Sequence, residues 1–298
     1  MTAGRLLEGV YVPLITPFAA DGSVAIDAVE RLSHEYLDAG SAGIVALGTT
    51  GEATALDVAE QRAVIDTCAR VCADHDAQLI VGAGTNSTAK TISAVEGLAG
   101  TPALVATLIV VPYYVRPSEA GVVAHFTAVA EASPVPVLIY NIPVRTGRNL
   151  GPAGMLELAR HPNVVGVKQA VGALDTETLE ILAAAPREFS VLGGDDPFLL
   201  PTVLMGGAGA ICASAHVCTE RFVAMAECGL TGKVDDGRAH ADALLPVVQA
   251  CFAEPNPSVF KGVLDAQGRI PTPDVRLPLV AASAGAVERA MAAVRAAQ

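Results

Sequence analysis

One lysine stands at the end of a short apolar run and is the first candidate for chemistry. The run VVGVKQA, residues 164–170, places three valines and a glycine ahead of Lys168. β-Branched residues in such a run predict a short buried strand, so Lys168 comes where that strand should end. An amine at the mouth of an apolar pocket loses hydration, which disfavours its charged form. A neutral amine can attack a ketone or aldehyde carbonyl and form a Schiff base, whereas a lysine outside such a pocket is a solvated surface group.

Hydroxyl groups follow two other predicted strands. Tyr140, in IYNIPVRTG, is either a half-buried packing residue or a phenol that moves protons while a carbinolamine forms and breaks down. Thr49, in LGTTGEAT, is short and rigid and could hold that phenol. The neighbouring Thr50 and the backbone N–H groups of this glycine-flanked turn could bind a carboxylate. The alternative is that GTTGE forms an ordinary turn.

The remaining polar candidates have both a functional and a structural interpretation. Arg145 is either a solvated loop charge or a bidentate ligand for a substrate carboxylate. Tyr113 and Tyr114 form either a surface aromatic pair or part of a subunit contact. We expect three further charged residues to be structural, as a turn, a helix cap and a surface position: Asp195, Asp196 and Lys261.

The composition excludes several classes of protein. The 298 residues carry a net charge of −12, and 52% of them are hydrophobic while 17% are charged. These values fit a globular protein, whereas an acidic chain without a basic cluster is a poor match for nucleic acid or an anionic membrane. The N-terminus has no cationic segment followed by an unbroken apolar stretch, so we expect no signal peptide.

The spacing of cysteines and histidines does not indicate a metal site. The six cysteines form no CxxC pair, and the six histidines show neither HxH nor HExxH spacing. We therefore expect buried, reduced cysteines in a cytoplasmic protein, and no bound metal.

Strand and helix patterns alternate along most of the chain. Apolar runs predict strands at 9–16, 43–47, 79–83, 103–111, 135–141, 164–170, 189–194 and 209–214. Helical patterns follow the first seven at 26–39, 57–73, from 88, 118–131, from 151, 174–184 and 197–205. Eight such units in roughly 220 residues favour an α/β protein with a closed (β/α)8 barrel. The alternative is a doubly wound parallel sheet, which the lack of a G-x-G-x-x-G after a strand disfavours.

Helical patterns alone follow the last predicted strand, at 217–228, 233–252, 257–264 and 283–297. We therefore divide the chain into a (β/α)8 catalytic barrel, residues 1–220, and a C-terminal helical region, residues 221–298. Side chains at the carboxyl ends of barrel strands face one rim. We expect Lys168, Tyr140 and Ile211 to meet there.

Seven segments have the order and spacing of a known family: GTTGE at 48–52, PYYVRPS at 112–118, YNIPVRTG at 140–147, GVKQA at 166–170, GGDD at 193–196, EPNPSVFKG at 254–262 and RLPL at 276–279. Together they resemble the dihydrodipicolinate synthase / N-acetylneuraminate lyase family of class I aldolases, over nearly the whole chain. The resemblance implies that Lys168 forms a Schiff base with pyruvate and that no separate cofactor takes part.

The resemblance also implies roles for the other candidates. Tyr140, Thr49 and Tyr114 would form a proton relay, with Tyr114 donated by a neighbouring subunit of a homotetramer. Thr50 and the backbone around Ile211 would bind pyruvate.

The second substrate depends on Arg145, which follows Tyr140 by five positions as in the synthase branch of the family. In that branch the arginine helps to hold L-aspartate 4-semialdehyde, so the implied reaction condenses pyruvate with this aldehyde to 4-hydroxy-tetrahydrodipicolinate, a step toward lysine. One alternative is a sister aldolase acting on a 2-keto-3-deoxy sugar acid or N-acetylneuraminate, whose branches usually lack this arginine. Another is a non-catalytic keto-acid-binding barrel, which would lack a relay residue.

Several positions depart from the family pattern. Lysine-inhibited synthases often carry histidines in the helix after GTTGE and a glutamate in the next helix, where this chain has Val58, Gln61 and Lys90. The resemblance therefore does not imply feedback inhibition by lysine. Ala53 stands where many synthases have serine, and KQAVG replaces the commoner KEA-x-G. Neither change touches the proposed Schiff-base chemistry.

Overall fold

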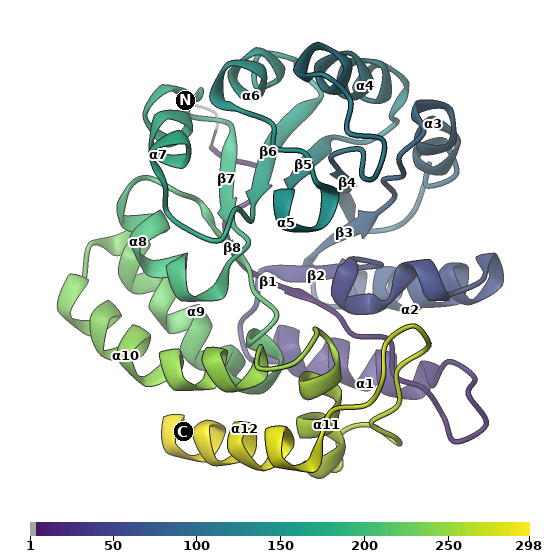
Figure 1. Cartoon of the computed structure of the whole chain (residues 1–298), viewed down its shortest axis with the longest axis vertical. Helices are drawn as coiled ribbons and strands as arrows, with labels where there is room; N and C mark the ends of the chain where they lie inside the picture. Colours follow the sequence, from purple (N-terminus) through teal and green to yellow (C-terminus); the bar gives the residue numbers. More distant parts are fainter. Residues whose placement is uncertain (1–3) are drawn as a thin grey trace.

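The computed structural model describes residues 4–298 and shows a closed barrel (Figure 1). Within these residues, eight parallel strands pair in sequence order, and β1 pairs with β8 to close the ring. The strands are β1 (Gly9–Pro13), β2 (Gly43–Ala46), β3 (Gln78–Gly82), β4 (Leu104–Val110), β5 (Val137–Asn141), β6 (Val164–Gln169), β7 (Ser190–Gly193) and β8 (Gly209–Ile211). The (β/α)8 prediction is confirmed, and the doubly wound alternative is excluded because that sheet stays open.

Helices surround the barrel and continue beyond it. They are α1 (Ile26–Asp38), α2 (Val58–Asp74), α3 (Thr88–Glu96), α4 (Glu119–Ala132), α5 (Pro143–Thr146), α6 (Pro152–Leu158), α7 (Thr176–Ala184), α8 (Leu199–Leu204), α9 (Ala215–Thr231), α10 (Val234–Cys251), α11 (Ser258–Ala266) and α12 (Ala284–Ala297). Short 3-10 helices occur at η1 (Thr49–Gly51), η2 (Ala53–Ala55) and η3 (Asp196–Phe198). The sequence patterns located most of these helices to within a few residues but missed α5.

The eighth strand is shorter than predicted. The apolar run suggested residues 209–214, but β8 ends at Ile211 and α9 begins at Ala215. The backbone N–H of Ser214 donates to Oδ2 of Asp196 at 2.6 Å, so the end of the apolar run bonds to a side chain and not to a neighbouring strand. This acceptor comes from another element, so the local pattern could not show it.

The barrel interior is filled by alternate strand residues, as expected for this architecture. They form one apolar cluster of Leu7, Tyr11, Val45, Ile80, Ala106, Leu108, Leu138, Tyr140, Ile142, Ala170, Leu192, Ala208 and Ile211. Close strand contact requires glycine at one point of β6, because a Cβ on Gly166 would lie 2.3 Å from the carbonyl oxygen of Ser190. The interior is therefore a packed core.

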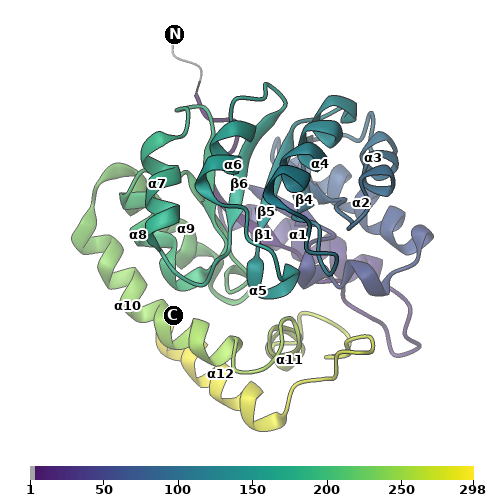
Figure 2. The same cartoon turned by 45° about the horizontal axis from the view of Figure 1, so that its top comes forward.

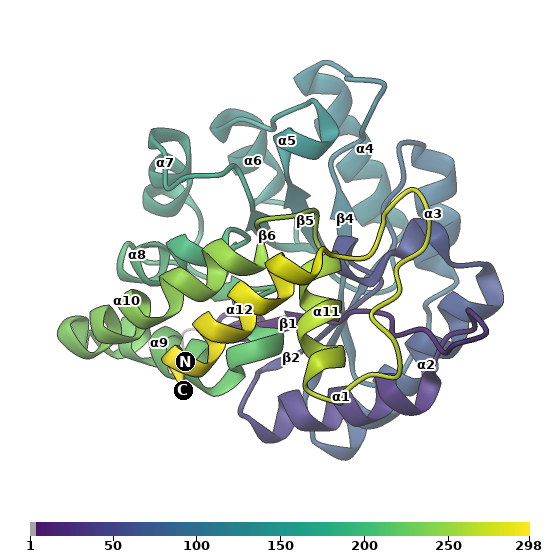
Figure 3. The same cartoon turned by 60° about the horizontal axis from the view of Figure 1, so that its bottom comes forward.

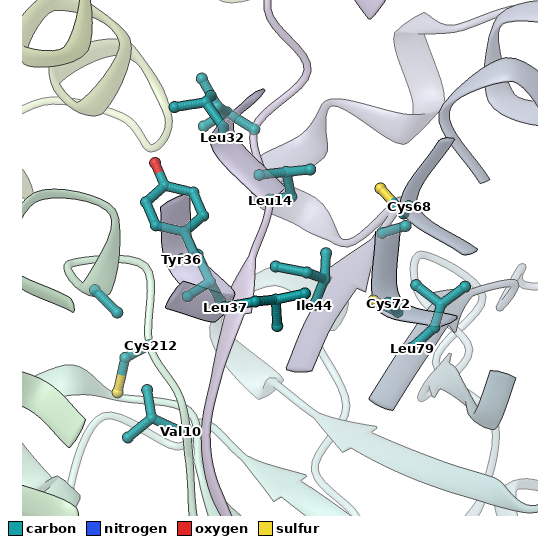
Figure 4. Close-up of a cluster of buried hydrophobic side chains, with 14 of the residues drawn as sticks. Val10, Leu14, Leu32, Tyr36, Leu37, Ile44, Cys68, Cys72, Leu79 and Cys212 are labelled. Carbon is teal, nitrogen blue, oxygen red and sulfur yellow. The ribbon is translucent and has the colours of Figure 1, made fainter. Parts of the chain in front are cut away.

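Two further apolar layers fix the helices to the outside of the barrel. One lies between β1–β3 and helices α1 and α2, where Leu14, Ile44 and Leu79 meet Leu32, Tyr36 and Cys68 (Figure 4). The other joins β4–β7 to α3, α4, α6 and α7. All six cysteines are unpaired, and five of them are buried.

The C-terminal helices form an additional layer with its own apolar cluster, which includes Val247, Phe260, Val263 and Ala290. Helix α12 contacts both α10 and α11 (Figure 3). Figure 2 shows α11 and α12 at the same end of the barrel as α5, which follows the carboxyl end of β5. Residue 220, the predicted boundary, lies inside α9, and the division into two units stays a prediction. In residues 4–298, no helix combines the length and apolarity needed to cross a membrane.

Candidate active site

Lys168 and Tyr140 lie side by side inside the barrel. They are register partners on β6 and β5, and Leu192 of β7 follows in the same register. Lys168 is 7% exposed, and its Nζ lies 4.5 Å from the centroid of the Tyr140 ring. Both residues are near the carboxyl ends of their strands. The structure therefore places one amine beside one phenol among the apolar side chains of the barrel interior, as an amine nucleophile with a nearby proton-transfer group requires.

Gly194 lies directly beside the Lys168 side chain. A Cβ on Gly194 would lie 2.7 Å from the Cβ of Ala170 and 3.1 Å from Cε of Lys168. The backbone N–H of Gly194 donates to the carbonyl of Gln169 at 2.7 Å, so β6 and the end of β7 are held together at this point. The Lys168 stem can occupy its position because residue 194 has no side chain.

Two acidic residues follow this glycine, and they are not merely a local turn and cap. Asp196 is 2% exposed and accepts from the backbone N–H of Ser214, whereas Asp195 accepts from the backbone N–H of Gly172 at 2.7 Å. Burial raises the pKa of both carboxyl groups, while the hydrogen bonds and the charge of Lys168 act in the opposite direction. The expected caps are therefore long-range contacts that place two acids in the electrostatic surroundings of the lysine.

The predicted threonine turn lies on η1. Thr50 is 3% exposed, and its Oγ1 accepts from Nδ2 of Asn256 at 3.0 Å. Thr49 is exposed. Among the hydrogen bonds of residues 4–298, none joins Thr49 to the hydroxyl of Tyr140, so that relay contact stays a prediction. Asn256 was missed because it lies in the C-terminal region, although the EPNPSVFKG segment had marked its neighbourhood.

Lys261 is not a surface residue, and this prediction was wrong. Its side chain is fully buried, and its Nζ lies 2.6 Å from Oε1 of Glu52, whose side chain is 1% exposed. The reason is that α11 buries most of its residues, so a lysine on it needs a counter-ion. The run SVFKGVLDA, apolar on both sides of one lysine, is the signal that could have indicated burial.

The rim carries the remaining candidates. Tyr114 is 87% exposed and has a left-handed φ of 68°, and its N–H donates to the carbonyl of Thr146 at 3.3 Å. Arg145 is exposed on α5. Ile211 is 1% exposed, in register with Tyr11. The structure thus joins the Tyr114 loop to α5, and it leaves the Arg145 and Tyr114 side chains facing solvent.

The three positions that depart from the expected pattern for lysine inhibition lie on α2 and α3. Val58 is 83% exposed at the start of α2, and Lys90 is exposed on α3. Gln61 donates through Nε2 to the carbonyls of Ala53 and Leu56, at 3.0 and 3.1 Å. Its amide therefore holds the 3-10 turn η2 in place.

Comparison with known proteins shows similarity along nearly the whole chain. The 4-hydroxy-tetrahydrodipicolinate synthase of Neisseria gonorrhoeae is 39% identical over 291 residues, which cover 98% of this chain and 99% of that protein. A dihydrodipicolinate synthase structure from Thermotoga maritima has a TM-score of 0.94 and 30% identity, covering 98% of this chain and 99% of that one. Another, described as the chloride-inhibited dihydrodipicolinate synthase of Acinetobacter baumannii complexed with pyruvate, has a TM-score of 0.93 and 30% identity, covering 97% and 98%.

The family assignment follows from the same comparison. A family-wide sequence profile, that of the Dihydrodipicolinate synthetase family, matches residues 6–297. The match includes the barrel, the lysine and tyrosine in its interior, and the C-terminal helices that reach the threonine turn. This chain belongs to the dihydrodipicolinate synthetase family.

Proposed function

We propose that this protein is a 4-hydroxy-tetrahydrodipicolinate synthase, a lyase of lysine and diaminopimelate biosynthesis that condenses pyruvate with L-aspartate 4-semialdehyde. The observation that carries the proposal is the buried Lys168 amine, 4.5 Å from the Tyr140 ring centroid. Relatives with about two fifths of their residues identical are named for this activity. The amine and the phenol supply the chemistry that such a condensation needs.

Lys168 begins the reaction as a nucleophile. Its neutral Nζ bonds to the ketone carbon of pyruvate, and the carbonyl oxygen leaves as water after it gains protons. The protonated imine draws electrons from the methyl carbon, which loses a proton and becomes an enamine carbon. That carbon attacks the aldehyde carbon, whose oxygen gains a proton and becomes the hydroxyl group. The amino group of the former semialdehyde then attacks the imine carbon, which closes the ring, and the Lys168 amine leaves as the cyclic product forms. The covalent imine does the work of a cofactor, so the proposed enzyme uses no other.

The other residues bind the substrates and move protons. Tyr140 exchanges protons with the carbinolamine, aided by Thr49 and by Tyr114 from a neighbouring copy of the chain. Thr50 and the backbone around Ile211 hold the pyruvate carboxylate, and glycine-flanked N–H groups suit an anion.

Arg145 binds the carboxylate of the semialdehyde at the rim, because a guanidinium can make two parallel hydrogen bonds to it. The proposed enzyme is a cytoplasmic homotetramer.

Borohydride reduction tests the covalent step. Protein incubated with pyruvate and borohydride should gain the mass of one reduced pyruvate adduct at Lys168, and Lys168→Ala should gain none. The same protein should then convert pyruvate and L-aspartate 4-semialdehyde to the cyclic product. An adduct on another residue would refute the role of Lys168. Cleavage of a 2-keto-3-deoxy sugar acid or N-acetylneuraminate without cyclic product would replace the synthase by the sister aldolase.

A further inference from the structure

The turn that carries Thr49 and Thr50 ends in a strained residue. Glu52 follows η1 directly and has φ 52° and ψ 34°, the left-handed conformation. A residue with a Cβ rarely adopts this conformation, and it persists only where the surroundings determine it. Contacts that fix the Glu52 side chain therefore also fix the preceding turn, η1.

Both carboxylate oxygens of Glu52 are bound by the C-terminal region. Oε1 lies 2.6 Å from Nζ of Lys261 on α11, and Oε2 accepts from the backbone N–H of Arg276 at 2.8 Å. The Lys261 ammonium also donates to the carbonyl of Asp274 at 2.8 Å and lies 3.9 Å from the centroid of the Phe18 ring. The ion pair is fully enclosed, so neither charge can turn to water when its partner is lost.

The same region also holds the turn through a second contact. Asn256, two residues before α11 begins, donates through Nδ2 to Oγ1 of Thr50 at 3.0 Å. A short stretch of chain around the start of α11 thus binds the Thr50 side chain and the Glu52 carboxylate together. Burial lowers the pKa of Lys261 to about 8, although the Glu52 carboxylate opposes this change. A costly buried charge at this place calls for a role beyond packing.

We propose that Lys261 is a positioning residue for the reaction: through the Glu52 carboxylate it fixes the turn that presents Thr49 and Thr50 to the substrate. The inference rests on the proposed function of that turn. Lys261 itself lies beyond the reacting atoms and acts through Glu52. The C-terminal helices are thereby part of the active site's framework.

The test separates pyruvate binding from protein stability. Lys261→Met keeps an unbranched side chain only one atom shorter and removes its charge. Compared with the wild type, it should raise KM for pyruvate and lower kcat, each by about tenfold, because small displacements of a binding group have effects of this size. Borohydride with saturating pyruvate should still label Lys168 in this variant, since the amine is untouched. Absence of labelling in the wild type would instead refute the proposed function.

Val263→Ala is the matched control. Val263 is fully buried on the same helix, in the apolar cluster of the C-terminal helices. The substitution should lower the melting temperature and leave KM for pyruvate unchanged. An equal rise of KM in Val263→Ala would show that any loosening of α11 suffices, and the positioning role of Lys261 would be rejected.

A double variant covers the case in which Lys261→Met does not fold. Lys261→Met with Glu52→Gln removes both charges and leaves none buried without its counter-ion, so it should fold better than the single variant. It should keep the raised KM, because the ion pair that fixes the turn is gone. A folded double variant with wild-type KM and kcat would overturn the proposal.

Discussion

At the scale of single residues, the position of the Lys168 amine depends on the absence of a side chain at residue 194. Lys168 is in register with Tyr140 on one side and Leu192 on the other. Its stem passes close to residue 194, where glycine leaves space. Apolar neighbours limit hydration, and the missing Cβ sets the direction of the amine. The position of the nucleophile is thus determined by packing as well as by its own strand.

Gly194→Ala should therefore move the amine. The new Cβ would lie 2.7 Å from the Cβ of Ala170 and 3.1 Å from Cε of Lys168, and the lysine stem is the more movable of the two. We expect the rate of borohydride trapping with pyruvate to fall by about tenfold or more. Gly285→Ala is the control, because it adds a Cβ at an exposed position of α12, 3.4 Å from Arg289. Equal trapping rates in both variants and the wild type would contradict this account.

Sequence patterns identified the site residues that lie at strand ends. They missed the residues whose positions depend on contacts between segments far apart in the sequence. Lys168 and Tyr140 each end an apolar run, and barrel geometry brings such ends together. Glu52 and Lys261 lie far apart in sequence, so their pairing depends on where α11 docks. The carboxylate of Asp196 likewise binds the N–H of Ser214, which lies 18 residues further along the chain.

At the scale of elements, the alternation of apolar runs and helical patterns predicted the order of strands and helices. Tertiary contacts determine where each strand or helix ends. Helix α5 has only four residues and begins at Pro143, so no helical period could appear in it. Strand β8 ends three residues earlier than its apolar run, whose last residue, Ser214, donates its N–H to Asp196 and not to a neighbouring strand. Propensity thus gives the existence of an element, whereas contacts from other elements set its boundaries.

His216 joins two elements at the base of α9 and should make stability depend on pH. It is fully buried, Nε2 accepts from the N–H of Ile15 at 3.1 Å, and Nδ1 donates to the carbonyl of Ala213 at 2.7 Å. Burial lowers its pKa from 6.5 to about 4. Below pH 6.5 the unfolded chain takes up a proton that the folded protein does not, so stability falls as the pH is lowered toward 4.

The loss attributable to His216 should be roughly 3 kcal/mol across this range, from about 1.4 kcal/mol for each pH unit of difference between the two pKa values. Denaturant unfolding of wild type and His216→Gln at several pH values measures it. The variant should be less stable at pH 7, and its stability should change less between pH 6.5 and 4. Parallel curves for the two proteins would show that this histidine is not the group responsible.

At the scale of the whole molecule, the barrel and the C-terminal helices share one functional end. The barrel was predictable because eight repeated units each carry the same pattern, and the interior cluster follows from alternation along the strands. The placement of α11 on the threonine turn could not be predicted, because it depends on a buried ion pair and a side-chain hydrogen bond between distant segments. The repeated strand-and-helix pattern thus predicts the barrel, whereas the active site also needs individual contacts between distant segments.

The rim of the molecule presents an aromatic residue to solvent in an unfavourable conformation. Tyr114 is 87% exposed with φ 68°, and the next residue, Val115, is 58% exposed. The N–H of Tyr114 donates to the carbonyl of Thr146, two residues after Val144, which is as exposed as Tyr114. A strained, exposed aromatic beside apolar neighbours is typical of a surface that another chain covers. We therefore expect Tyr114 to act in the site of a neighbouring copy within the proposed homotetramer.

Mixing two inactive variants tests this arrangement directly. Lys168→Ala lacks the amine but can donate Tyr114, and Tyr114→Phe keeps the amine but donates no hydroxyl. Each alone should be nearly inactive. In a hybrid, the site of the Tyr114→Phe chain would receive tyrosine from its Lys168→Ala neighbour, so a co-expressed equal mixture should regain about a quarter of wild-type activity, because half of all pairs are mixed and each mixed pair has one complete site. If Tyr114 instead served its own chain, every site in the hybrid would lack one group, and the mixture would stay as inactive as its components.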